Sequence, residues 1–321
     1  EMPLQTGPEP RDSQTTDVSF YVSYILPLLD HPEILFIHVK IHLQLYRKHG
    51  SIQITAHGDR SAVHVHDILC NGKSEAVALT VNMLIDELLN RCKREEGYRD
   101  YFDIAVQGYH GDRVVSLWGD PERTFMRPSE LAGAELCRVD VQQERTLPGG
   151  KTVVSVISQK IWVRPLASDK TPMYSALRRC HELCSQWCSR RSNRESYPPT
   201  IFNITDGESS EGDERRLLDA AESIRKLGTD DGTALLINIH ICSDESRRQV
   251  LFPMSEQELP EQRYARLLYR MSSSMPDIYG ESIVRLRGGG DGPFRGMSYN
   301  AGMTELVSMM DIGSVSVNLL F

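Results

Sequence analysis

The 321-residue sequence lacks the features that mark membrane, secreted and nucleic-acid-binding proteins. No apolar run approaches the roughly 20 residues that a transmembrane helix needs. The polar start, Glu1–Thr16, has no signal-peptide core and is predicted to be a disordered tail. The net charge of −8 argues against nucleic acid as the main partner, because such binding usually requires a basic face. We therefore expect a cytoplasmic protein with no membrane and no nucleic-acid partner.

Signatures of common catalytic sites are also missing. The sequence has no Gly-x-Ser-x-Gly nucleophile motif, no Gly-x-x-x-x-Gly-Lys phosphate loop and no Gly-x-Gly-x-x-Gly dinucleotide motif. The glycine run Gly288–Gly292 lacks the strand–turn–helix context of a phosphate loop, and we predict a flexible loop there. These absences favour a binding protein over an enzyme.

Cysteine is present in an odd number, seven, and most cysteines fall inside predicted helices or strands. This pattern favours free thiols in a reducing compartment. Cys180, Cys184 and Cys188 recur every four residues along a helix predicted to begin at Thr171. Their spacing differs from the CxxC of zinc knuckles, and His181 lies about 100° around the helix from Cys180. We expect these thiols to pack in the core rather than to form a metal or redox site.

Predicted strands and helices alternate between Ser61 and Ser243, which indicates a mainly parallel sheet covered by helices on both faces. The predicted strands are Ser61–Asp67, Asp103–Tyr109, Arg113–Trp118, Thr152–Val163, Thr200–Thr205 and Ala234–Cys242. The predicted helices are Lys73–Arg94, the cysteine helix and Asp213–Leu227, and the segment Ser129–Gln143 is predicted to be irregular.

The two ends of the chain are expected to add to this core. Asp17–Leu29, Glu33–Tyr46 and Ser51–Ala56 are predicted to be extra strands that extend the sheet, with a helix as the alternative for Phe20–Leu29. Gln257–Met275 carries a helical stripe, and Asn300 is predicted to cap a final helix. We therefore divide the chain into a tail (1–16), a strand-rich extension (17–60), an α/β domain (61–250) and a C-terminal helical extension (251–321).

Three polar residues mark the expected functional site. Asp206 follows the apolar strand Thr200–Thr205, Asp67 ends an earlier strand, and Thr171 begins a helix after another strand. In open α/β sheets, ligands bind beyond the carboxyl ends of the strands. Carboxylate and hydroxyl oxygens are ligands suited to Mg²⁺. Each residue also has a purely structural interpretation, because Thr-Pro commonly starts a helix and Asp-Gly commonly forms a turn.

Thr200–Gly207 and Thr171–Met173 resemble two of the three metal loops of von Willebrand factor A (VWA) domains. The helix Lys73–Arg94 and the stretch Arg99–Val106 also match that family, so the resemblance spans roughly Ser61 to Ser243. The segments Tyr264–Ser273 and Asn300–Gly313 look like an extension found in stand-alone bacterial VWA proteins. The resemblance implies a Rossmann-like α/β fold and a metal-ion-dependent adhesion site, where a partner's carboxylate completes the shell of a divalent ion.

The first metal loop departs from the family pattern. VWA domains have Asp-x-Ser-x-Ser there, and this chain has Asp67-Ile68-Leu69-Cys70-Asn71. Leu69 cannot ligate a metal, and only Asn71 offers an oxygen in place of the second serine. The resemblance therefore implies a degenerate site of Asp67, Asn71, Thr171 and Asp206, with Mg²⁺ bound weakly or not at all. It implies a non-enzymatic module or scaffold with protein partners, in a bacterial defence, stress or signalling system.

The histidines suggest an alternative function. Seven of the ten lie within the first 66 residues. They are His31, His38, His42, His49, His57, His64 and His66. A His-x-His pair at a strand end, followed by Asp67, is how several metallohydrolases begin their metal site. Such an enzyme needs further ligands at later strand ends, where only His240 and Asp206 are candidates. A metal-dependent hydrolase centred on His64, His66 and Asp67 is therefore the alternative.

Overall fold

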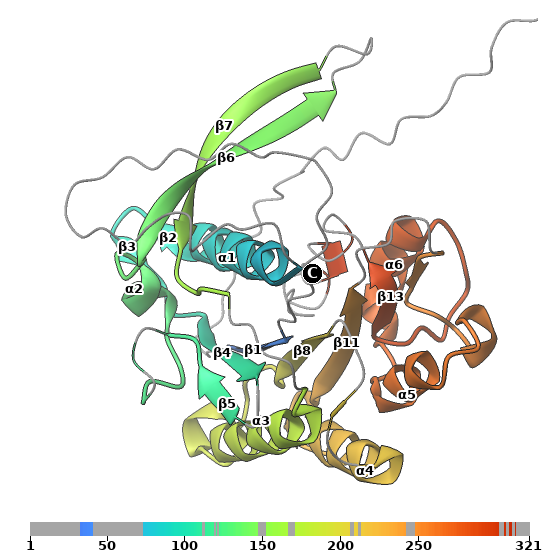
Figure 1. The fold of residues 1–321 in the computed structure, drawn as a ribbon. Coiled ribbons are helices and arrows are strands. Elements are labelled where there is room, and N and C mark those ends of the chain that lie inside the picture. Colours follow the sequence, from blue (N-terminus) through green and yellow to red (C-terminus); the bar gives the residue numbers. More distant parts are fainter. Residues whose placement is uncertain are drawn as a thin grey trace, which may run out of the picture.

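The computed structural model describes residues 33–40, 73–110, 113–118, 120, 122–146, 152–165, 171–205, 209–210, 213–241 and 248–301, and residues 305, 308–309 and 312. The described part is a mixed α/β structure in which a seven-stranded mixed sheet lies between layers of helices (Figure 1). The expected combination of a central sheet and flanking helices is therefore confirmed.

The main sheet has the strand order β12-β13-β11-β8-β1-β4-β5. Five strands run parallel to one another, and they are β1 (Glu33–Lys40), β4 (Phe102–His110), β8 (Thr200–Thr205), β11 (Leu235–Ile241) and β13 (Met297–Ala301). The edge strands β5 (Arg113–Ser116) and β12 (Val250–Leu251) are antiparallel to their neighbours. Every residue of β8 and β11 is buried, as expected for parallel strands covered on both faces.

Strand β1 lies at the centre of the sheet, paired in register with β4 on one side and β8 on the other. The prediction that Glu33–Tyr46 extends the sheet is corrected, because its strand fills an interior position. The run Ile34-Leu35-Phe36-Ile37 has the continuous apolar composition of a strand buried on both faces. The predicted strands Asp17–Leu29, Ser51–Ala56 and Ser61–Asp67 lie outside the described residues.

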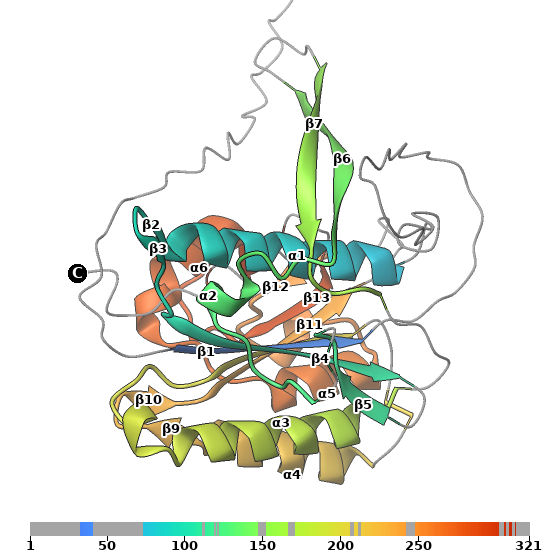
Figure 2. The ribbon, with the colours of Figure 1, turned by 90° about the vertical axis from the view of Figure 1, so that its left-hand side faces the viewer.

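Helices cover both faces of this sheet (Figure 2). Helices α1 (Lys73–Cys92) and α6 (Gly280–Arg287) pack on one face, and α3 (Met173–Cys188), α4 (Glu214–Arg225) and α5 (Arg263–Met271) pack on the other. The predicted helices at Lys73–Arg94 and Asp213–Leu227 are confirmed within about two residues at each end. Each face buries its own cluster of aliphatic and aromatic side chains against the sheet.

Strands β6 (Cys137–Thr146) and β7 (Thr152–Ile161) form a separate antiparallel ribbon, which projects from the α1 side of the molecule (Figure 1). The prediction that Ser129–Gln143 is irregular is wrong from Cys137 onward. This polar segment carries little strand signal of its own, and it becomes a strand by pairing with β7. At the base of the ribbon, Val139 and Ile161 are buried, and Lys160 forms a 3.0 Å ion pair with Asp86 of α1.

Shorter elements connect these layers. They are α2 (Pro128–Leu131), the hairpins β2 (Lys93–Arg94) with β3 (Gly97–Tyr98) and β9 (Gly228–Thr229) with β10 (Gly232–Thr233), and 3₁₀ turns at Arg191–Asn193, Glu256–Glu258 and Asp277–Tyr279.

The C-terminal part of the described chain contributes a strand as well as helices. Asn300 lies in β13 with a backbone φ of 59°, so the prediction that it caps a helix is wrong. The next described residue, Glu305, is helical. Gly288 ends α6 in the left-handed conformation that favours glycine, at the start of the predicted loop. The stripe predicted within Gln257–Met275 is helix α5.

The cysteines of α3 confirm the expected packing role. Cys180 and Cys184 are fully buried, with their Sγ atoms 3.9 Å apart, and Cys188 is half-buried at the end of the helix. Burial raises the pKa of Cys184 well above its usual value and that of Cys188 to about 11. Since the thiolate is the reactive form, Cys184 and Cys188 are held in their unreactive state at neutral pH.

We expect Cys180 and Cys184 to react at least about a hundredfold more slowly with a thiol reagent in the native protein than after denaturation. Peptide mapping by mass spectrometry after timed labelling at pH 8 would follow each thiol separately. Cys137, which is only partly buried, is the internal reference. Native labelling of Cys180 as fast as that of Cys137 would contradict the packing role.

Candidate functional site

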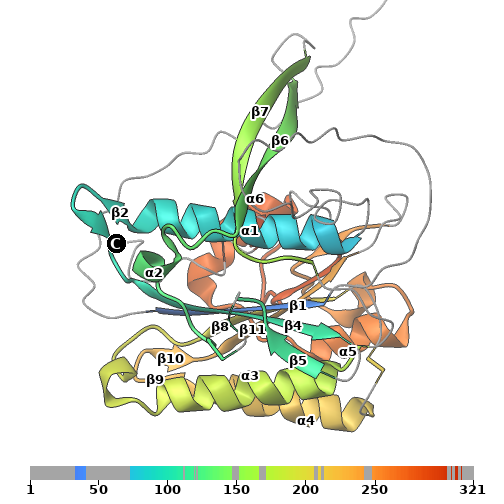
Figure 3. The same cartoon turned by 60° about the vertical axis from the view of Figure 1, so that its left-hand side comes forward.

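The connections between strands define a switch point at the carboxyl edge of the sheet. From β1 the chain continues through α1 to β4 on one side, and from β8 it continues through α4 to β11 on the other. Ligands of open α/β sheets bind outside the strand ends at such a reversal. In Figure 3, the end of α1 next to β2 lies on the side opposite the arrowhead of β4. Because β2 follows α1 in the chain, this is the carboxyl end of the helix, and α1 therefore begins at the carboxyl edge of the sheet. The candidate site therefore lies beyond the carboxyl ends of β1 and β8.

Thr171 is the one predicted site residue within the described part of the chain, and it lies at this edge. It is 4% exposed and stands two residues before α3, whose N-cap position is taken by Pro172 rather than Thr171. Its backbone N–H donates to Ser210 Oγ at 2.7 Å, and its carbonyl accepts from the Ser210 N–H at 2.9 Å. The Ser209 hydroxyl approaches the same carbonyl at 3.4 Å. Thr171 is thus fixed to the segment that follows β8.

The other predicted residues, Asp67, Asn71 and Asp206, lie outside the described residues. Their places in the sequence are still informative. Asp206 directly follows Thr205, the last residue of β8, and Asn71 stands two residues before the start of α1. Within the described part of the chain, no group of three or more His, Cys, Asp or Glu side chains is arranged to hold a metal ion.

An aromatic cluster that the sequence did not reveal lies at the ends of β8, β11 and β13. The imidazole of His240 stacks on the ring of Tyr299, with ring centroids 4.5 Å apart and planes at 5°. Tyr264 of α5 meets the same imidazole edge-on at 5.7 Å and donates its hydroxyl to Thr205 Oγ1 at 3.2 Å. Together with Thr171, these four residues form what we call the carboxyl-edge rim.

The backbone is irregular where β11 and β13 reach this rim. The pairing register shifts between Ile239 and Ile241, and the N–H of Asn300 approaches His240 Nδ1 at 3.4 Å. A register shift next to a residue in the left-handed backbone conformation changes the direction in which the side chains point. Such irregularities often accompany functional sites. His240, considered from sequence as a ligand of the alternative hydrolase, is buried among aromatic rings in the structure.

A groove of about 270 Å³ opens beside the rim. It is lined by Arg248, Val250, Glu258, Leu259, Pro260, Gln262 and Tyr299. The Tyr299 hydroxyl donates to Gln262 Oε1 at 2.5 Å, which connects the groove to the aromatic cluster. Aliphatic walls with a few polar groups are typical of recognition sites. The sequence does not reveal this groove, because its residues come from three separate elements and form no local motif.

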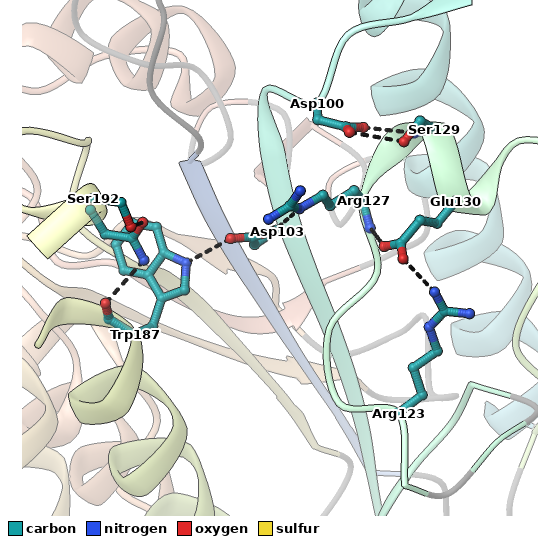
Figure 4. A network of polar contacts seen from close by, with 9 residues as sticks. Asp100, Asp103, Arg123, Arg127, Ser129, Glu130, Trp187 and Ser192 are labelled. Atoms are coloured by element: carbon teal, nitrogen blue, oxygen red, sulfur yellow. Dashed lines mark hydrogen bonds and ion pairs between the residues drawn. The ribbon is translucent and has the colours of Figure 1, made fainter. Parts of the chain in front are cut away.

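A further polar network lies at the opposite edge of the sheet, near the start of β4 (Figure 4). Asp103, near the start of β4, accepts hydrogen bonds from the Trp187 indole at 2.9 Å and from Arg127 Nε at 3.2 Å. Glu130 bridges the Arg127 backbone and the Arg123 side chain. These groups join α3 to β4 and to the segment before α2. Because they satisfy one another, we assign this network a structural role.

Comparisons with known proteins leave the family open. No protein-family model matches the chain, and no curated protein matches it significantly. Among the described residues, no helix is both long and apolar enough to cross a membrane.

Proposed function

We propose that this protein is a non-enzymatic interaction module of the VWA type, acting as a cytoplasmic scaffold in a bacterial defence, stress or signalling assembly. The strand order is the observation that supports this most. With β12 left out, the strands of the main sheet are, along the chain, β1, β4, β5, β8, β11 and β13. Numbered 1 to 6 in that sequence, they have the spatial order 3-2-1-4-5-6. This is an order found in doubly wound proteins, whose ligands bind at the carboxyl ends of the strands.

The chemistry of the carboxyl-edge rim favours recognition of a partner over catalysis. Its polar groups are tied into the fold, since Tyr264 donates to Thr205 and Tyr299 donates to Gln262. The rings of His240, Tyr264 and Tyr299 are themselves buried, so they hold the rim rigid, and a rigid surface loses little conformational entropy when it binds a partner.

A carboxylate of the partner is the ligand that this edge would accept. Helix α3 begins beside Thr171, and α4 begins nine residues after the end of β8, with Asp213 capping it. The amino ends of helices carry partial positive charge and favour anions. A weakly held Mg²⁺ at Asp67, Asn71, Thr171 and Asp206 would add to this attraction. We expect only weak binding because Leu69 cannot replace a ligating serine.

Replacing Asp206 with alanine tests the proposal. We expect partners captured by the tagged full-length protein to fall at least about tenfold, because the change removes the carboxylate at the end of β8. Quantitative mass spectrometry of parallel captures, with Mg²⁺ and with a chelator, would measure this. Chelation is expected to have a smaller effect than Asp206→Ala.

Asp231→Ala provides the matched control. Asp231 is an exposed aspartate in the β9–β10 turn, which Figure 3 places away from the strand arrowheads. Its replacement should leave the captured proteins unchanged. If Asp206→Ala folds normally and retains every partner, the carboxyl-edge rim is not the interaction surface. Zinc or manganese retained in stoichiometric amounts after purification would instead support the hydrolase.

A further inference from the structure

Helix α5 presents an unusual concentration of positive charge on its outer face. Arg266, Tyr269 and Arg270 are spaced three and four residues apart, so they lie on one face of the helix. Arg295, from the segment before β13, places its guanidinium over the Tyr269 ring at 5.1 Å. Arg225, at the end of α4, reaches the same region. We call Arg225, Arg266, Arg270 and Arg295 the arginine cluster.

Two of these guanidinium groups meet at a single acceptor. Arg225 Nη1 and Arg295 Nη1 both donate to the carbonyl of Ser272, at 3.2 and 3.0 Å. The neighbouring residue, Ser273, hydrogen-bonds to Leu236 near the start of β11. This part of the cluster therefore lies near the amino end of β11, away from the carboxyl-edge rim.

Nearby carboxylates compensate part of this charge. Glu256 accepts two hydrogen bonds from Arg270, and Arg270, with smaller effects of Arg266 and Arg295, lowers the pKa of Glu256. Glu214 is shared between Arg270 and Arg263. Within the described residues, Arg225, Arg266 and Arg295 form no ion pair with a carboxylate. Other arginines of this half of the molecule, such as Arg285 and Arg287, have acidic partners. The imbalance is notable in a chain with a net charge of −8.

The unpaired guanidinium groups are also partly removed from water. The Nε atoms of Arg225 and Arg266 are buried and have no hydrogen-bond partner among the described residues. Burial, and next the positive charge of Arg295, lower the pKa of Arg225. Like charges held together in a half-buried position destabilise a fold unless an anion offsets them.

We propose that the arginine cluster is a binding site for a phosphate group. Guanidinium groups donate in a planar fork that fits phosphate oxygens, and clusters of them are a common means of recognising phosphate. Arg225 and Arg295 would approach the phosphate from the Ser272 side, and Arg266 from α5. The phosphate belongs either to a small molecule or to a modified residue of a protein.

Calorimetric titration of the full-length protein tests the proposal. We expect inorganic phosphate to bind with a dissociation constant of about 1 mM, in buffer of constant ionic strength. A short glycine-flanked phosphoserine peptide and its unmodified form distinguish the source. Binding of the phosphopeptide tighter than that of phosphate indicates a protein-borne group, whereas equal or weaker binding indicates a small molecule.

The variants separate a real site from general salt effects. Arg266→Gln removes a guanidinium whose side chain makes no hydrogen bond within the described residues, so the fold should persist. We expect it to weaken phosphate binding about tenfold, and the double variant Arg225→Gln/Arg295→Gln to abolish binding. Arg285→Gln, at an exposed arginine paired with Glu281, is the control and should bind normally. Absence of saturable phosphate binding, or equal binding by wild type and Arg266→Gln, would overturn the proposal.

Discussion

Replacing Asn82 with leucine is expected to lower the free energy of unfolding by about 4 kcal/mol. Asn82 lies on α1 and is 1% exposed. Its Oδ1 accepts from the backbone N–H groups of Trp162 at 2.7 Å and Val163 at 3.0 Å, and its Nδ2 donates to the carbonyls of Ala78 at 2.8 Å and Val163 at 2.9 Å. Leucine would leave two buried N–H groups without an acceptor, next to the end of the β6–β7 ribbon.

Urea unfolding followed by far-UV circular dichroism would measure the loss. Asn90→Leu is the matched control, since Asn90 is exposed on the same helix, and its replacement should change stability by less than about 1 kcal/mol. Equal stabilities of the two variants would show that Asn82 does not join the ribbon to α1.

Asp103→Leu should destabilise the protein by about 3 kcal/mol. The Trp187 indole is fully buried and donates to Asp103 Oδ2, so leucine would leave this N–H without its acceptor (Figure 4). Arg127 would lose less, because its side chain is 55% exposed and can bind water instead.

Asp100→Leu controls for the general effect of removing a carboxylate in this region. Asp100 is exposed and accepts hydrogen bonds only from Ser129 among the described residues. We expect its replacement to cost at most about 1 kcal/mol, measured by the same urea titration. A cost for Asp103→Leu as small as that for Asp100→Leu would contradict the structural role of the buried carboxylate.

The elements predicted correctly have signals contained within one short segment. Helix α1 carries an apolar stripe at helical spacing, and β8 and β11 are short apolar runs of the kind that parallel strands require. The core position of Cys180 and Cys184 followed from their spacing on a single helix face. In each case the residues that decide the structure lie within a few turns of one another.

The candidate site was predictable only in part. The place of Thr171 before a helix indicates it from sequence, and the structure joins it to Ser209 and Ser210 after β8. The stacking of His240 on Tyr299 and the groove beside it required residues from separate strands and helices to meet. Asp67, Asn71 and Asp206 remain predictions from sequence.

The sequence by itself determined which segments are apolar and at what period, and hence most of the helices and strands of the alternating core. Only the tertiary structure decided that β1 lies between β4 and β8, that β6 and β7 leave the sheet as a ribbon, and that Arg225 and Arg295 meet at the carbonyl of Ser272. Strand order and the meeting of distant side chains depend on pairing between segments many residues apart. Such pairing is set by the free energy of burying those segments together, and no local pattern encodes it.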